Sequence, residues 1–280
     1  LWTASSLLML NSVQVANAQD KKPMAPVRAT KVSFLKKESF DKVKLKKKGQ
    51  KIERFAPQVG HSGHLTDMQL SADGKILVTA SGLSDGLVKV WDMEQDKTLL
   101  TLDSEDSVTI SPDGKLVAAG NIGGPIKVWN VESGALVKTL EGSGPVRFVA
   151  GGELLVGEAM PKKGVPEGTI ELWSTKDWSA KKLAQPHDAS LSTLATSKDG
   201  EVLVTGSYDD SIKVWAVKSG EVLATLKEGI RTPSAIAISH DLKTLAVGYQ
   251  GEGGSVDLLD LSTGKIKKSL KVKGNVTGLD

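Results

Sequence analysis

LVKVWDM at 87–93 is the stretch that decides the fold, because related segments recur along the chain at a nearly constant interval. They read PIKVWNV at 125–131, TIELWST at 169–175, SIKVWAV at 211–217 and SVDLLDL at 255–261. The tryptophans, with a leucine in the last segment, are separated by 38, 44, 42 and 44 residues. A period near forty residues is typical of a repeat architecture, and the short alternating runs predict strands rather than helices.

Each repeat predicts four short strands. A β-branched run such as KILVTAS at 75–81 precedes the tryptophan strand, and the turn SADG at 71–74 precedes that run. A second turn, such as ESG at 132–134, leads to a last strand, such as LVKTL at 136–140. Gly accepts a positive φ at no steric cost, so Asp-Gly suits a hairpin turn. Four strands in about forty residues are the layout of a propeller blade.

This pattern resembles the WD40-repeat β-propeller family over residues 60–280. The first and fourth repeats carry the family's GH…DG…D…WD signature most completely, at Gly60-His61, Asp73-Gly74, Asp85 and Trp91-Asp92, and at His187, Asp199-Gly200, Asp209 and Trp215. The resemblance implies an all-β, WD40-type β-propeller with five recognisable four-stranded blades and the start of a sixth. The blades are expected at about 60–102, 103–140, 141–183, 184–226 and 227–270, with the next beginning at 271–280.

The chain also departs from the family pattern. Gly123, Glu167 and Gly253 stand where the family has an aspartate in a turn, and Leu259 replaces the tryptophan of the fifth repeat. Residues 271–280 stop within the first strand of a repeat, and the sequence does not begin with methionine. We therefore expect a fragment with an incomplete ring, and a monomeric propeller within a longer chain.

The resemblance further implies a buried hydrogen-bond network in two blades, from Asp through His and Thr to the Trp indole. The matching sets are His61, Thr79, Asp85 and Trp91, and His187, Thr205, Asp209 and Trp215. An Asp–His–Thr set also resembles a hydrolase triad, which is recognised by geometry rather than by residue type. The threonines are expected inside strands, and no G-x-S-x-G elbow is present, so a structural role is favoured.

No motif predicts a metal or a cofactor. The chain has no cysteine and no H-E-x-x-H segment. The paired glycines at 123–124 and 253–254 precede predicted strands, whereas a phosphate-binding loop precedes a helix. A C-x-x-C-H haem motif is also absent. We expect neither a catalytic site nor a metal or cofactor site.

The first eighteen residues predict a truncated signal peptide. An apolar run at 7–10 is followed by Ala16-Asn17-Ala18, which matches an A-x-A cleavage site. The uncharged stretch is shorter and more polar than the roughly twenty apolar residues of a membrane anchor. This favours an exported, bacterial-type protein of the periplasm or the extracellular space, and no membrane span after cleavage. An apolar N-terminal strand of a cytoplasmic protein is the alternative.

A basic region follows, with 13 Lys and Arg against 4 Asp and Glu between residues 19 and 59. Residues 19–40 predict a basic linker. Residues 41–59 have the layout of the last two strands of a repeat and predict a degenerate strand pair, which we assign to the closing blade. Lysines on such an outer edge discourage aggregation. An arm that binds a polyanion is the alternative, although nucleic acid is not favoured as a partner.

A fold alone gives no function, but the resemblance implies a non-catalytic scaffold that binds a protein or peptide. The strongest candidate surface is the long loop GEAMPKKGVPEGT at 157–169, on one rim of the propeller. The candidate contact residues are Arg147, Met160, Lys162, Lys163 and Arg231. The alternative function is the propeller module of a larger exported enzyme or redox protein, such as a quinoprotein-like or haem-domain fusion.

Overall fold

The computed structural model describes residues 60–82, 85–103, 106–183, 185–227, 229–249 and 254–279. Within these residues, five antiparallel sheets of four strands each follow one another along the chain. The first two sheets comprise β1 (Asp67–Leu70), β2 (Ile76–Ala80), β3 (Leu87–Asp92), β4 (Lys97–Asp103), β5 (Ser107–Ile110), β6 (Leu116–Gly120), β7 (Ile126–Asn130) and β8 (Leu136–Leu140). The third comprises β9 (Gly142–Val149), β10 (Leu154–Ala159), β11 (Ile170–Ser174) and β12 (Ala180–Lys182). The fourth and fifth comprise β13 (Leu191–Thr196), β14 (Val202–Ser207), β15 (Ile212–Ala216), β16 (Glu221–Leu226), β17 (Pro233–Ile238), β18 (Thr244–Tyr249), β19 (Ser255–Asp260) and β20 (Ile266–Lys271).

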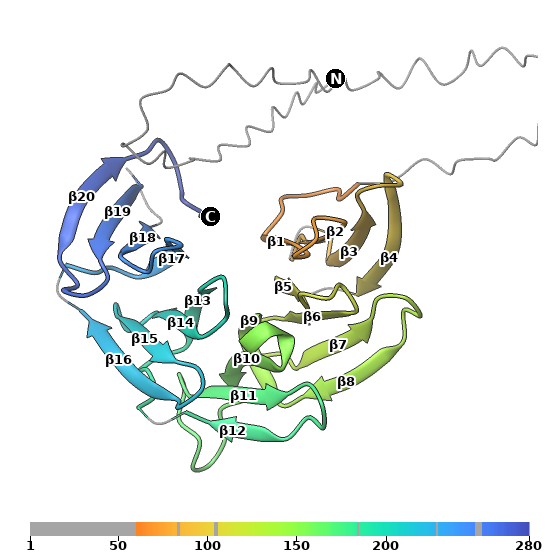
Figure 1. The fold of residues 1–280 in the computed structure, drawn as a ribbon, viewed down its shortest axis with the longest axis horizontal. Helices are drawn as coiled ribbons and strands as arrows, with labels where there is room; N and C mark the ends of the chain where they lie inside the picture. The colour runs from red at the N-terminus through yellow and green to blue at the C-terminus, as the bar shows by residue number, and fades with distance from the viewer. Residues whose placement is uncertain are drawn as a thin grey trace, which may run out of the picture. The chain divides into compact units, whose positions relative to one another are not determined.

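The sheets are the blades of a propeller. In Figure 1 they follow one another in chain order around a common centre, with the first strand of each sheet innermost. Neighbouring innermost strands contact each other in the order β1, β5, β9, β13 and β17. The predicted WD40-type propeller with five four-stranded blades is therefore confirmed.

The turns form where the Asp-Gly pairs predict them. Gly74 and Gly114 adopt φ values of 73° and 70°, a left-handed conformation that side chains other than Gly rarely adopt. Asp73 accepts a hydrogen bond from the Ser71 hydroxyl at 2.7 Å and from the Lys75 N–H at 3.1 Å. The side chain of Asp73 thus fixes the turn before β2 begins.

The apolar core lies between neighbouring blades. Val78 and Val90 of the first blade pack together with Val108 and Ile110 of β5 in the second. Similar clusters join the second blade to the third, the third to the fourth, and the fourth to the fifth. Each blade therefore depends on its neighbours to bury its apolar faces, as in other repeat architectures.

The ring is incomplete in the described residues, as predicted. Met68 and Leu70 of β1 are 51% and 48% exposed, whereas Val108 and Ile110, their equivalents in β5, are 0% and 2% exposed. At the other end of the chain, Val276 packs against Ala235 and Val256 of the fifth blade. The described residues thus bury the faces between the five blades, and they leave exposed the face of the first blade that has no neighbouring blade.

The predictions for the N-terminal region lie outside the described residues. They concern the signal peptide at 1–18, the linker at 19–40 and the strand pair at 41–59. In the part of the chain that the structure describes, no helix has the length and apolar character needed to cross a membrane.

Candidate functional site

The first blade holds a continuous hydrogen-bond network from Asp85 to Trp91. The His61 Nδ1 lies 3.1 Å from the Asp85 carboxylate, and its Nε2 lies 2.8 Å from the Thr79 Oγ1. The Trp91 indole N–H donates to the same hydroxyl oxygen at 2.8 Å. Because a carboxylate only accepts, Nδ1 carries the ring proton and Nε2 accepts from Thr79.

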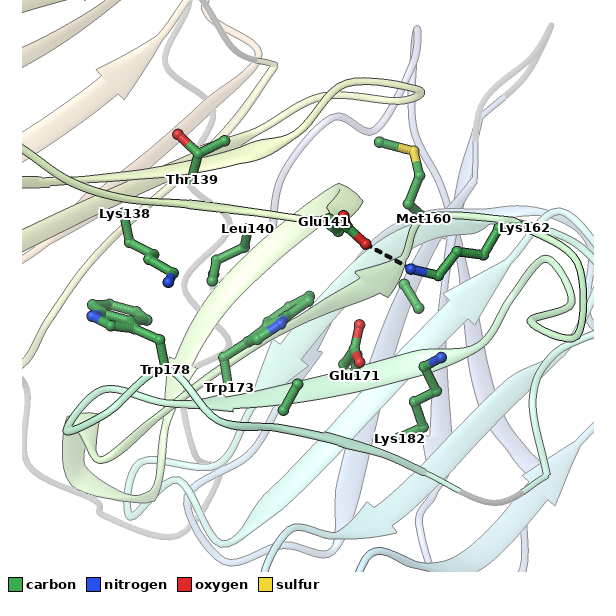
Figure 2. Close-up of a pocket in the computed structure, with 12 residues that line it drawn as sticks. Lys138, Thr139, Leu140, Glu141, Met160, Lys162, Glu171, Trp173, Trp178 and Lys182 are labelled. Carbon is green, nitrogen blue, oxygen red and sulfur yellow. Dashed lines mark hydrogen bonds and ion pairs between the residues drawn. The ribbon is translucent and has the colours of Figure 1, made fainter.

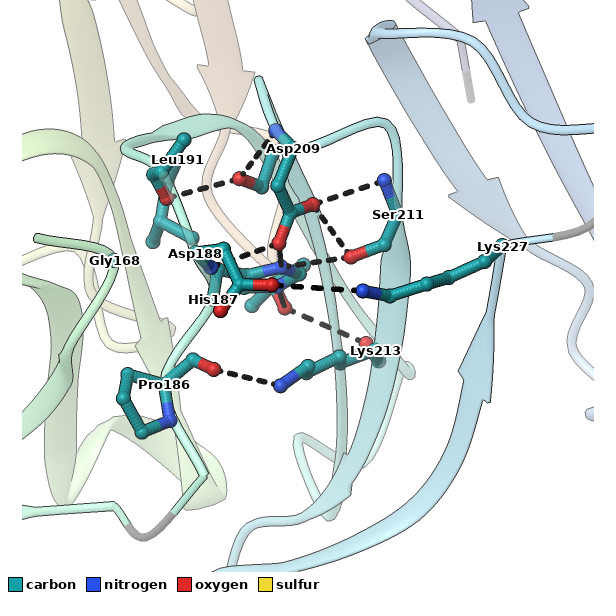
Figure 3. Close-up of polar contacts among 12 residues, drawn as sticks. Gly168, Pro186, His187, Asp188, Leu191, Asp209, Ser211, Lys213 and Lys227 are labelled. Carbon is teal, nitrogen blue, oxygen red and sulfur yellow. Dashed lines mark hydrogen bonds and ion pairs between the residues drawn. The ribbon is translucent and has the colours of Figure 1, made fainter.

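The fourth blade has the same network, and its His and Asp side chains are more buried than those of the first blade. Figure 3 shows His187 beside Asp209 and Ser211. The His187 side chain is 0% exposed; its Nδ1 lies 3.1 Å from Asp209, and its Nε2 lies 2.7 Å from the Thr205 Oγ1. The Trp215 indole N–H donates to Thr205 at 2.9 Å. Ser211 donates to Asp209 through both its hydroxyl and its N–H.

Burial and hydrogen bonding act on the pKa values of this second network. Burial alone would raise the pKa of Asp209, but hydrogen bonds from Ser211 and the Asp188 N–H, and the charge of His187, lower it to about 2. Burial lowers the pKa of His187 below 6.5, although Asp209 opposes this. Neutral His187 and ionised Asp209 are therefore the stable forms near neutral pH.

These sets are built for structure rather than for nucleophilic chemistry. Thr205 is 0% exposed, and its hydroxyl is shared between His187 and Trp215. A nucleophile must reach its substrate, whereas this oxygen lies in the interior of the blade. A fully satisfied polar network of this kind rigidifies the structure around it.

The third blade replaces the network with a different one, which the repeat pattern did not reveal. Gly157 occupies the place that Thr79 has in the first blade, and the neighbouring Glu158 is 1% exposed. The Glu158 carboxylate accepts hydrogen bonds from the Gly168 N–H, the Ser190 hydroxyl and the Leu191 N–H, at 2.9, 3.1 and 2.9 Å. It therefore joins the third blade to the start of the fourth. The sequence signal was a glutamate inside the apolar run of β10.

Arg147 lies on an innermost strand and is not a free cation of the rim. Its guanidinium forms a two-point ion pair with Asp67 of β1, at 2.8 and 3.0 Å. The two side chains are 21% and 16% exposed. A bidentate Arg–carboxylate pair is a strong, orienting contact, so Arg147 links the first and third blades.

Other side chains of the innermost strands bond the backbone of the next blade. Asp67 accepts from the Val108 N–H at 3.0 Å, and the Gln69 side chain accepts from the Ile110 N–H at 3.0 Å. The Thr109 hydroxyl oxygen accepts from the Phe148 N–H at 3.2 Å. The inner edges of the first three blades are thus tied together by side chains.

Arg231 is also engaged. One guanidinium N–H donates to the Ser255 hydroxyl at 2.7 Å, and the guanidinium carbon lies 4.6 Å from the centre of the Tyr249 ring. These contacts hold Arg231 against the fifth blade, whereas the predicted loop, which begins at 160 because residues 157–159 end β10, belongs to the third. The structure therefore does not bring Arg147 and Arg231 together with the other three candidate residues.

Met160, Lys162 and Lys163 do lie together on the loop after β10. Lys162 and Lys163 are exposed, and the Lys162 ammonium lies 2.6 Å from the Glu141 carboxylate (Figure 2). Both partners of this pair are exposed, at 55% and 82%, so it contributes under about 1 kcal/mol. Lys163 has no hydrogen bond or ion pair among the described residues. This loop presents two cations beside a thioether at one edge of the third blade.

The described residues contain no group of three His, Asp or Glu side chains placed to hold a metal ion. The acidic residues of the two His networks are already used as hydrogen-bond acceptors.

Comparison with known proteins identifies the repeat. The family model described as WD domain, G-beta repeat matches residues 53–92 and 180–216. The first match includes β1 to β3, and the second runs from β12 to β15. Both matches contain one of the complete His networks.

Three curated relatives share about a quarter of their aligned residues with this chain. Telomerase protein component 1 of Rattus norvegicus is 26% identical over 69% of this chain and 7% of its own length. COMPASS component SWD3 of Saccharomyces cerevisiae is 24% identical over 79% of this chain and 72% of its own length. The small ribosomal subunit protein RACK1 of Candida albicans is 27% identical over 57% of this chain and 39% of its own length. The chain thus spans a small part of the rat protein and less than half of the Candida protein.

Proposed function

We propose that this WD40-type propeller is a non-catalytic scaffold that binds a protein or peptide partner outside the cytoplasm. The observation that carries the proposal is the loop at 160–169, which exposes Lys162 and Lys163 beside Met160 at one edge of the third blade. Loops on a rigid scaffold are frequent recognition elements. Exposed cations attract an acidic partner and speed encounter, and methionine gives adaptable apolar contact.

The relatives support a role in assemblies. By their names, the yeast relative is a component of COMPASS and the Candida relative is a protein of the small ribosomal subunit. Both names describe a subunit of a larger complex. A role for this chain as a binding platform in a complex agrees with those names, and its partner is expected to be a protein.

The proposed location outside the cytoplasm rests on the sequence of the first eighteen residues. The apolar run at 7–10 and the Ala16-Asn17-Ala18 site follow the layout of a secretory signal peptide.

The double substitution of Lys162 and Lys163 by Glu tests the scaffold proposal. It should weaken capture of partners from an envelope extract and flatten the salt dependence of capture, because it removes the attracting charges. It should leave the free energy of unfolding within about 0.5 kcal/mol of the wild-type value, because both positions are exposed.

Matched controls separate this surface from general charge effects. Glu in place of Lys198 and Lys218, exposed on the fourth blade, makes the same change of net charge elsewhere. Glu in place of the lysines at 42–48 tests the alternative of a basic arm. If the variant at 162 and 163 captures the same proteins while the variant at 42–48 loses them, the loop is not the binding element.

A further inference from the structure

A groove of about 290 Å³ lies between the outer parts of the second and third blades. Its walls include Lys138 of β8, Trp173 and Glu171 of β11, and Trp178 of the turn that follows (Figure 2). β12, the outermost strand of this blade, has only three residues, all of them exposed, and Ala180 and Lys182 of this strand also line the groove. The volume is close to the lower limit for ligand pockets, about 300 Å³.

Trp178 occupies a backbone position that three of the other blades give to glycine, and the first blade gives to Asp96. Its φ is 60°, and the corresponding turns have Gly134, Gly220 and Gly264 at 69°, 79° and 69°. In all four turns this residue donates its N–H to the carbonyl oxygen four residues earlier. A residue with a side chain in the left-handed region costs about 1–2 kcal/mol of stability. Strained backbone conformations of this kind cluster at functional sites. Here the residue places an indole ring on the groove.

Trp173 presents an indole N–H that its blade does not use. In the first and fourth blades the equivalent N–H donates to a threonine, but Gly157 stands at that place in the third blade. A Cβ atom at Gly157 would lie 2.7 Å from Ile126 and 3.3 Å from the Trp173 ring. Among the described residues, no acceptor takes the Trp173 N–H.

Glu171 provides an acceptor beside that donor. The equivalent residue is Lys89 in the first blade and Lys213 in the fourth. Glu171 is 9% exposed, and in the described part of the chain its carboxylate takes part in no hydrogen bond. Burial raises the pKa of Glu171, and the charges of Lys182 and Lys162 oppose that rise. One N–H donor and one carboxylate acceptor facing the same groove match the C=O and N–H of a peptide backbone.

Charge decides which peptide fits. Among the described residues, Lys138 and Lys182 line the groove and form no ion pair, whereas Lys162 is paired with Glu141. With three lysines and two glutamates the groove carries a positive balance, so it repels a cationic side chain and attracts a carboxylate.

We propose that the groove binds a short acidic peptide segment of a partner protein. An aromatic or large aliphatic side chain of that segment stacks on Trp178, its backbone pairs with Trp173 and Glu171, and an adjoining carboxylate meets Lys138. The proposal rests on the proposed scaffold function and specifies the chemistry of the ligand.

Calorimetric titration of the full chain with capped peptides tests the groove. The probe is acetyl-Gly-Phe-Asp-Asp-Gly-amide, and the comparison peptides replace both Asp by Lys or the Phe by Ala. We expect binding of the acidic probe alone, with shifts of the Trp173 and Trp178 indole N–H resonances in an NMR spectrum. Trp178→Gly should weaken binding by at least about tenfold, as the loss of an aromatic anchor does.

Trp178→Gly installs the residue that the second, fourth and fifth blades use, which relieves the left-handed backbone, although it also removes the packing of Trp178 on the core between the second and third blades. A cooperative melting curve of this variant shows that a loss of binding does not come from misfolding. Lys138→Glu should weaken binding and reduce its salt dependence, while Lys198→Glu, its matched control on the fourth blade, should do neither. The proposal is overturned by equal binding of the Lys peptide, by unchanged binding to Trp178→Gly, or by no binding of the probe at millimolar concentration. If the probe fails while capture still depends on Lys162 and Lys163, the groove is excluded and the scaffold function remains.

Discussion

Trp215 and Trp129 occupy the same place in their blades but have different partners. The Trp215 indole N–H completes a network through Thr205 and His187, whereas the second blade has Ala119 at the threonine position and Gly123 in the turn. The same tryptophan therefore has a polar role in one blade and an apolar role in the other.

The Trp215→Phe substitution should cost about 1–3 kcal/mol of stability, because it leaves buried hydroxyl and imidazole groups poorly satisfied. Trp129→Phe should cost less, because the described residues of the second blade offer its indole no such partners. Urea unfolding of both variants checks the difference, and equal losses would contradict the structural role given to the network.

The fourth-blade network also predicts how stability depends on pH. His187 has a folded pKa below 6.5, so its contribution is full above about pH 6.5 and is lost as the pH falls through the folded value. Asp209 has a folded pKa of about 2 against 3.8, so its contribution is lost between about pH 4 and pH 2. The stability difference between the wild type and Asp209→Asn should therefore shrink across that lower interval. A difference that stays constant in urea titrations at pH 5, 4, 3 and 2 would show that Asp209 is not held ionised.

At the scale of the element, the packing of the third blade shows why a threonine cannot simply be introduced at Gly157 to rebuild the His network. Gly142 and Gly157 flank the Trp173 ring so closely that a Cβ atom would lie 2.6 Å from it at Gly142 and 3.3 Å from it at Gly157. At Gly157 the Cβ atom would also lie 2.7 Å from Ile126, so the Ile126 side chain and the ring together fill the space that a threonine would need.

Gly157→Thr should therefore destabilise the protein by about 1–3 kcal/mol, the usual cost of overpacking, although threonine is the residue of the first and fourth blades. Thermal unfolding measures this cost. The variant Ala119→Thr in the second blade makes a comparison at the equivalent position, and a stabilising effect of Gly157→Thr would show that the blade can accept the network after all.

The repeating elements were predictable from the sequence because their signals are local. The Asp-Gly turns, the β-branched runs and the tryptophan period each lie within about forty residues, and they identify the five blades. Both His networks were predicted from the resemblance to the WD40 family pattern. Contacts between blades have no such signal, since Arg147 and Asp67 lie 80 residues apart. In the sequence, Glu158 and Trp178 were visible only as departures from the repeat pattern. Glu158 is a glutamate in an apolar run, and Trp178 stands in a turn that has glycine in three other repeats.

At the scale of the whole molecule, the proposed export predicts a processed N-terminus. Protein expressed from the complete reading frame in a secreting bacterial host should begin at Gln19, because the Ala16-Asn17-Ala18 site directs cleavage after Ala18. Mass spectrometry of the purified protein and of the Ala18→Leu variant, which should stay uncleaved, checks this. An intact leader on cytoplasmic wild-type protein would exclude the proposed location.

The side chains that tie the innermost strands together also decide how well these strands are shielded. An innermost strand has a partner in its own sheet on one side only, so alternate N–H groups point towards the neighbouring blade. The side chains of Asp67, Gln69 and Thr109 accept hydrogen bonds from such N–H groups on the innermost strand of the next blade. The amides of Val108, Ile110 and Phe148 should consequently exchange with deuterated solvent as slowly as those of central strands. Gln69→Ala should speed exchange at Ile110 alone, and it would open a short stretch of strand edge to pairing with a foreign chain.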